Sequence, residues 1–254
     1  MGLRINTNVP SLIAQRNLRT TRGNLDKTLE RLSSGSKINH AGDDAAGLAI
    51  SESFRAQLRG LGQAERNAQD GISLVQVAEG AMAEISNILI RMRELGVQAA
   101  SDTIGQTERQ FLEVEYQQLL EEIDRIAQST EYNRVPLLNG TASTFEVQVG
   151  TRNNPVIDRI RLFDSNAADV NVVALGINLA SVGDKTSAQN SLGALDNALG
   201  SVTAIRAEFG AMQNRLQSVV NNIMISRENI AAANSRIRDT DMAEETTELT
   251  KHQI

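Results

Sequence analysis

Acidic side chains occur in two close groups whose spacing could support chemistry. Asp43 and Asp44 are adjacent, and Glu121, Glu122 and Asp124 form a second group. Paired carboxylates can act as general acid and base, or bind a cation. The first pair, however, directly precedes the run Ala-Ala-Gly-Leu-Ala-Ile, where acids stabilise the positive end of a helix. We therefore interpret the first pair as helix N-caps and the second group as a solvated helix face.

Other catalytic and metal chemistries lack the residues they need. The 254 residues contain no Cys, and the two histidines are His40 and His252. Thiol nucleophiles, Cys-based metal centres and disulfides are excluded, and a three-His metal site cannot form. The zincin, phosphate-loop, dinucleotide-binding and nucleophile-elbow motifs are also absent. The sequence therefore predicts no enzyme, no metal site and no cofactor.

Charge is unevenly distributed along the chain. The whole chain carries −6, but residues 1–40 carry +5 and residues 239–254 carry −4. Arg outnumbers Lys by 21 to 4, which favours planar interface contacts. Net acidity and few aromatic residues argue against a nucleic-acid partner. The two ends are thus predicted to be complementary segments of a protein that assembles.

No segment predicts a membrane partner or a cleaved leader. No run of about 18 apolar residues is present, as a spanning helix would need. The start lacks the apolar core of a secretory signal. Its basic, acid-poor composition is typical of a mitochondrial transit peptide, but an apolar heptad pattern that continues through it argues against that alternative.

Apolar residues recur at three- and four-residue spacing over four long segments, which predicts four helices. The predicted helices cover residues 5–34, 44–100, 106–129 and 186–237. The apolar pattern continues thinly to Ile254 with no capping signal, as though the chain stopped within a helix. Each Gly within a helix costs about 1 kcal/mol relative to Ala. Close packing is therefore expected at the second helix's glycines, which are Gly60, Gly62, Gly71 and Gly80.

Between the third and fourth helices the pattern changes to that of strands. Apolar and polar residues alternate over 145–149 and again over 159–162, with a turn at 151–155. A further short strand is expected at 172–174. The predicted fold class is mainly α, a long rod-like helical bundle or coiled coil with a small β-hairpin element. Within this region Asn139-Gly140-Thr141 fits the N-glycosylation pattern, and we treat it as unmodified because such triplets are common.

The first and last segments carry too little apolar surface to offset their ordering cost within one chain. We expect both ends to be disordered in the monomer and to order on assembly.

A charged surface cluster is expected near the end of the second predicted helix, where Arg91, Arg93, Glu94 and Leu95 form an exposed cluster. Arg91 and Leu95 are four residues apart and share one helix face.

Segments along nearly the whole chain resemble bacterial flagellins, in the same order. They are LRINTN (3–8), RLSSGSKINHAGDDAAGLAIS (31–51), RMRELGVQAA (91–100), EEIDRIAQSTEYNRVPLLNG (121–140), FEVQVGTRNN (145–154) and SRIRDTDMAEET (235–246). The resemblance implies a structural subunit that self-assembles into the flagellar filament used for swimming. It also implies a minimal central variable region and a C-terminus shortened by several helical turns.

The resemblance implies five regions. They are an N-terminal inner-core helix and linker (1–43), N-terminal rod helices (44–139), a hairpin with a short variable region (140–185), a C-terminal rod helix (186–235) and a truncated C-terminal inner-core segment (236–254). The implied location is extracellular, in the filament of the flagellum, after secretion. The implied partners are other copies of the chain, the type III export apparatus, an export chaperone, and the filament-cap and hook-junction proteins.

The resemblance also implies a candidate ligand for the Toll-like receptor that senses flagellin. The family's site maps onto Arg91, Leu95 and Glu115, although Ile90 stands where many recognised flagellins have Gln. Two alternatives remain for the function. One is a minor filament or hook–filament junction subunit. The other is a helical signalling rod similar to chemoreceptor cytoplasmic domains, which the hairpin and the unequal helices argue against.

Overall fold

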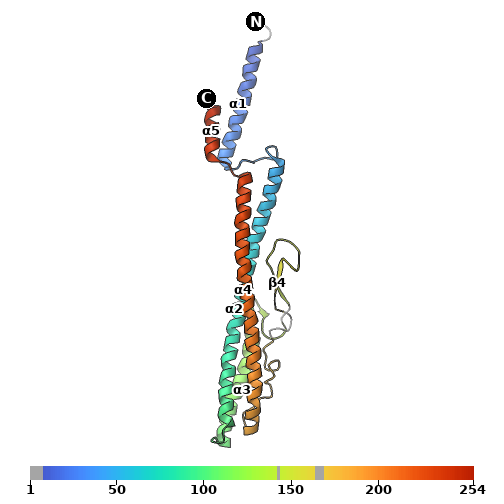
Figure 1. Cartoon of the computed structure of the whole chain (residues 1–254), viewed down its shortest axis with the longest axis vertical. Coiled ribbons are helices and arrows are strands. Elements are labelled where there is room, and N and C mark those ends of the chain that lie inside the picture. The colour runs from blue at the N-terminus through green and yellow to red at the C-terminus, as the bar shows by residue number, and fades with distance from the viewer. Residues whose placement is uncertain (1–7, 142–143, 164–168) are drawn as a thin grey trace. The chain divides into compact units, whose positions relative to one another are not determined.

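The structure is a computed structural model that describes residues 8–141, 144–163 and 169–254. It contains two compact units. The first is formed by residues 1–60 and 225–254, and the second by residues 61–224. Two long helices, α2 (Ala45–Ala100) and α4 (Lys185–Arg238), contribute to both units (Figure 1).

The remaining elements are three shorter helices and two pairs of short antiparallel strands. They are α1 (Val9–Ser34), α3 (Gln106–Ser129), α5 (Met242–Gln253), β1 (Glu131–Tyr132) with β2 (Val135–Pro136), and β3 (Phe145–Gln148) with β4 (Arg159–Phe163). The mainly α fold class with a small β-hairpin is confirmed. None of the helices in the described residues is both long and apolar enough to cross a membrane.

The core of the second unit forms where α2, α3 and α4 turn their apolar seams toward one another. Its largest fully buried side chains include Met82, Ile85, Leu89 and Met92 from α2, Tyr116 and Ile123 from α3, and Leu195 and Leu216 from α4. The spacing of these residues is the three- and four-residue period that predicted the helices. Burial raises the pKa of the Tyr116 hydroxyl to about 12, because the phenolate would lose its solvation.

The β3–β4 hairpin lies against α2 at Gly71. A side-chain carbon on Gly71 would sit 3.1 Å from Val147 Cγ2 and 3.4 Å from Leu216 Cδ1, so the glycine permits a close approach. Asn67 Nδ2 adds a hydrogen bond of 3.0 Å to the Gln148 carbonyl oxygen. The expected close packing thus holds at Gly71, whereas Gly80 has no neighbouring atom within 4 Å.

The segment 169–184 forms turns, so the strand expected at 172–174 is wrong. Two of the backbone donors that the expected strand would have used are taken by side chains. Val172 N donates to Asp124 Oδ1 at 2.8 Å, and Ala174 N donates to Asn171 Oδ1 at 2.7 Å. A side chain that satisfies the backbone competes with strand pairing, which a period-two pattern alone does not reveal.

In the first unit, the linker after α1 is joined to the end of α4 by backbone hydrogen bonds. Gly35 ends α1 in the left-handed region, with φ 66°. Lys37 N then donates to the Arg238 carbonyl oxygen at 2.6 Å, and Thr240 N donates to the Gly35 carbonyl oxygen at 3.0 Å. We call this pair of bonds the strap. The strap lies where α4 stops and the chain turns into α5.

The predicted fourth helix, 186–237, ends within one residue of the observed end of α4, and the thin apolar pattern beyond it forms a separate helix, α5. Asp241 caps α5, because its side chain accepts from Ala243 N at 2.8 Å and from Glu244 N at 3.3 Å. The sequence signal for this break was Asp-Thr-Asp ahead of two glutamates, an ordinary helix start.

Candidate functional site

Arg91 occupies the centre of a surface ion-pair cluster built by α2 and α3. Its Nε donates to Glu115 Oε1 at 3.0 Å, and its Nη1 donates to Glu94 Oε2 at 3.0 Å. Glu115, and then Glu94, raise the pKa of Arg91 above its usual value. The Arg91 side chain is 51% exposed and that of Glu115 is 44% exposed, so both remain accessible to a partner.

Leu95 does not belong to this surface. It is 1% exposed and packs in the core of the second unit, although Arg91 is only one helical turn away. The expectation that Leu95 lies in an exposed cluster is therefore wrong. The reason is that positions four apart differ by about 40° around a helix. Leu95 therefore lies within the buried apolar face of α2, whereas Arg91 lies at the edge of that face.

Exposed apolar side chains lie on α2 close in sequence to Arg91, and Val97 among them was not predicted to belong to the site. Ile90 and Val97 are 46% and 51% exposed, and with Arg93, Glu94 and Gln98 they line a shallow hollow on α2. Arg93 Nε donates to Asp196 Oδ1 on α4 at 2.7 Å, and this carboxylate raises the pKa of Arg93. The side of α2 that carries Arg93 therefore combines exposed aliphatic groups with a fixed guanidinium.

Asp43 and Asp44 have separate roles at the start of α2. Asp44 Oδ1 accepts from Gly47 N at 2.9 Å, which is the geometry of a helix N-cap. Asp43 instead accepts from Asn39 N and His40 N, at 3.3 and 3.2 Å, through one oxygen. Its other oxygen forms a 2.6 Å ion pair with Lys27 Nζ of α1. Asp43 therefore fixes the linker to α1.

The Lys27 bond, followed by the His40 amide, lowers the pKa of Asp43 from 3.8 to about 2. Because the folded pKa is the lower one, the contribution of Asp43 to linker stability is present above pH 3.8. We expect it to be lost as the pH falls from about 3.8 towards 2. Amide-exchange protection of Asn39 and His40 should fall over that range in the wild-type chain, and should be low at every pH in Asp43→Ala. Wild-type protection that stayed constant down to pH 2 would contradict this role.

The acidic group on α3 has structural partners. Glu122 Oε1 forms a 2.6 Å ion pair with Arg125 Nη2, and Glu121 Oε2 accepts from Gln118 Nε2 at 3.2 Å. Asp124 holds the loop at Val172, as described above. Within the described ranges, no three His, Asp or Glu side chains are grouped to hold a metal ion. The contacts thus assign these acids to holding helices and loops.

Helix α1 exposes several large apolar side chains along its length. Thr28 is the one buried residue of this helix. The exposed large apolar side chains are Val9, Leu12, Ile13, Leu18 and Leu29, of which Leu18 is the most exposed at 69%. A helix that exposes this many aliphatic side chains is typical of a surface that packs against a partner.

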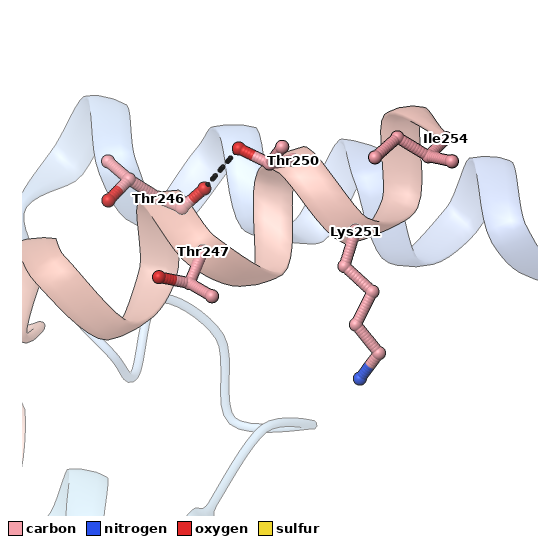
Figure 2. Close-up of a pocket in the computed structure, with 5 residues that line it drawn as sticks. All are labelled: Thr246, Thr247, Thr250, Lys251 and Ile254. Atoms are coloured by element: carbon pink, nitrogen blue, oxygen red, sulfur yellow. Dashed lines mark hydrogen bonds between the residues drawn. The ribbon is translucent and has the colours of Figure 1, made fainter.

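Helix α5 runs beside α1 (Figure 1). The sequence of α5 is net acidic, whereas that of α1 is net basic. Arg31 Nη1 lies 3.7 Å from Glu245 Oε1, so part of the predicted complementarity is satisfied within one chain. The outer face of α5 forms a shallow pocket, and Figure 2 shows its threonines along the helix. The Thr250 hydroxyl donates to the Thr246 carbonyl oxygen at 2.9 Å, so it serves its own helix. No residue of α5 is buried.

Comparison with known proteins identifies the family. The bacterial flagellin N-terminal helical region matches residues 5–143, and the bacterial flagellin C-terminal helical region matches residues 192–254. A flagellin of Halalkalibacterium halodurans is 46% identical over 98% of this chain and 90% of its own length. The flagellar filament 33 kDa core protein of Treponema phagedenis is 41% identical over 98% of this chain and 91% of its own length.

Solved structures agree with this result. The crystal structure of Bacillus cereus flagellin is 35% identical, with a TM-score of 0.55, and covers 66% of this chain and 94% of that chain. A putative flagellar hook-associated protein from Vibrio parahaemolyticus is 14% identical, with a TM-score of 0.62 over 78% of this chain and all of that chain, and shows a shared fold alone. From the two matched helical regions and the relatives that span nearly its whole length, the chain belongs to the bacterial flagellin family.

Proposed function

We propose that this chain is a structural subunit of the flagellar filament, and that neighbouring subunits join through the exposed apolar face of α1 together with α5. The single observation that supports this joining surface is the apolar exposure of α1, which buries one residue and exposes five large aliphatic ones. Burying each aliphatic side chain at a neighbour contributes about 1.5–3 kcal/mol. Repeated along an open helical array, such contacts favour growth of a polymer.

The remaining partners follow from the family and are part of the same proposal. The chain is secreted through the flagellar export apparatus, is escorted by a chaperone that binds its C-terminal segment, and is added beneath the filament cap beyond the hook junction. The absence of any buried residue in α5 supports the chaperone step, because its exposed surface is available before assembly. Its location is the extracellular filament.

Hydrogen exchange tests whether the terminal helices are ordered by assembly. In the free chain we expect weak protection of the α1 amides, because few side-chain contacts hold that helix. In the polymer we expect strong protection of the same amides. The α3 amides serve as the internal control and should be protected in both states, since α3 contributes four buried residues to the core. Strong protection of α1 in the free chain would show that the helix needs no partner.

We further propose that the Arg91–Glu115 pair binds the host Toll-like receptor for flagellin, with Leu95 as a core residue that positions α2. The accessible, pre-formed ion pair supports this role. Arg91→Ala should reduce receptor signalling at least about tenfold, since arginine is enriched among the few interface residues whose truncation costs about 2 kcal/mol or more. Arg93→Ala is the matched control, because it removes an equally exposed arginine whose partner is Asp196. Equal signalling by the Arg91 variant and the wild type would contradict receptor binding by this pair.

The hook–filament junction alternative is not favoured. The relatives that cover nearly all of this chain include flagellins and filament core proteins, at 38–46% identity. The hook-associated structure shares its fold at 14% identity, which carries no argument about assembly position.

A further inference from the structure

The sequence contains a single Asn-Gly pair, Asn139-Gly140, in the loop that follows β2. The residues before it are anchored, because Leu137 and Leu138 are buried and the Leu138 carbonyl oxygen accepts from Val170 N at 3.1 Å. Gly140 is in the left-handed region, with φ 71°. The chain is therefore anchored directly before the pair, and Gly140 follows in a conformation that favours glycine.

The side-chain amide of Asn139 is oriented by two donors from Thr141. Asn139 Oδ1 accepts from Thr141 N at 3.1 Å and from Thr141 Oγ1 at 2.7 Å. A backbone N–H can only donate, so the atom that faces it is the oxygen. Two donors on one carbonyl oxygen make the attached carbon more electrophilic and stabilise negative charge on that oxygen, as an oxyanion hole does.

A carboxylate lies against the backbone of Gly140. A side-chain carbon on Gly140 would overlap the Asp169 carboxylate, with 2.7 Å to its Cγ, so a larger residue would require Asp169 to move. Asp169 Oδ1 accepts from Asn171 N at 3.2 Å, while Oδ2 is the oxygen nearest Gly140. The structure thus places a carboxylate beside Gly140, and a carboxylate that reaches the Gly140 N–H can accept its proton.

We propose that Asn139-Gly140 is a self-deamidation site, in which the folded loop supplies the groups that promote the reaction. Gly140 N attacks Asn139 Cγ and gives its proton to Asp169, forming a tetrahedral oxyanion that the two Thr141 donors stabilise. The bond from Cγ to Nδ2 then breaks, and the nitrogen takes a proton and leaves as ammonia. Water opens the resulting succinimide at either carbonyl, which leaves aspartate or isoaspartate at position 139.

The product changes the loop in a defined way. Both products place a second carboxylate near Asp169, and isoaspartate also adds a methylene to the main chain. Like-charge repulsion and the changed chain length both oppose the bond between Leu138 and Val170. Amide-exchange protection of Val170 therefore reports the modification independently of mass.

The test incubates the intact chain near neutral pH and measures conversion at residue 139 by peptide mass spectrometry and isoaspartate assay. We expect the folded chain to convert at least as fast as the same chain in denaturant. Thr141→Val and Asp169→Asn should each slow conversion at least about threefold. Asn190-Ser191, inside α4, is the internal control and should stay intact, because the helix fixes its backbone.

An Asn139 that stays intact in the folded chain while the denatured chain converts would overturn the proposal. Conversion that is equally fast in both variants and the wild type would also overturn it, since the loop would then supply no assistance. A Thr141→Ser variant, which keeps the hydroxyl donor, should restore the wild-type rate. None of these conversion rates depends on filament growth, so they test the deamidation site independently of the proposed assembly.

Discussion

Replacing Leu18 with aspartate should leave the free chain folded and strongly weaken its addition to a filament. Leu18 is 69% exposed on α1, so the free chain loses no buried contact. In the proposed polymer the leucine is buried, and its removal costs about 1.5–3 kcal/mol for each subunit added. Burying an unpaired carboxylate adds to that cost. The critical concentration for growth on filament seeds should therefore rise at least about tenfold.

Asn17→Asp is the matched control for this experiment. It adds the same charge one residue away on the exposed surface of α1 without removing an apolar side chain. We expect it to elongate seeds close to the wild-type rate, as measured by sedimentation and electron microscopy. Circular dichroism of both variants should match the wild type. A Leu18→Asp chain that elongated normally would show that α1 joins subunits through another face, or not at all.

The helices could be predicted from sequence because apolar spacing and helix formation share one physical cause. The predicted third helix, 106–129, has the observed bounds of α3, and Gly35 ends the first helix as its left-handed conformation requires. The β3–β4 hairpin also follows from period-two alternation. These elements are each determined by residues close in sequence.

The features that could not be predicted depend on residues far apart in sequence. The strap pairs residues near 36 with residues near 239, and no local pattern at either place indicates the other. Asp124 and Val172 are 48 residues apart, so the loop that replaces the expected strand is set by an acid on another helix. Likewise, Asp43 and Asp44 read as one pair of caps, but Lys27 on α1 gives Asp43 a different role.

Leu95→Ala should destabilise the second unit strongly, and this separates a core role from a receptor-contact role. Leu95 is 1% exposed among the fully buried side chains of that unit. Truncating such a leucine removes transfer free energy and leaves a cavity, together worth about 2–5 kcal/mol. We expect the midpoint of urea unfolding to fall, and exchange protection of the α3 amides to fall with it.

Val97→Ala is the matched control, because it truncates an aliphatic residue two positions away on α2 that is 51% exposed. Its effect on unfolding should be within about 0.5 kcal/mol. Arg91→Ala should also leave unfolding nearly unchanged, since exposed ion pairs contribute about 0–1 kcal/mol.

The two substitutions should therefore reduce receptor signalling for different reasons. Arg91→Ala weakens it without loss of stability, whereas Leu95→Ala weakens it only under conditions in which the second unit loosens. A Leu95→Ala chain that kept full stability while losing receptor signalling would place this side chain in direct contact with the receptor. Leu95 is buried in the free chain, so it would then have to become exposed on binding. The free energy of that rearrangement would reduce the affinity for the receptor.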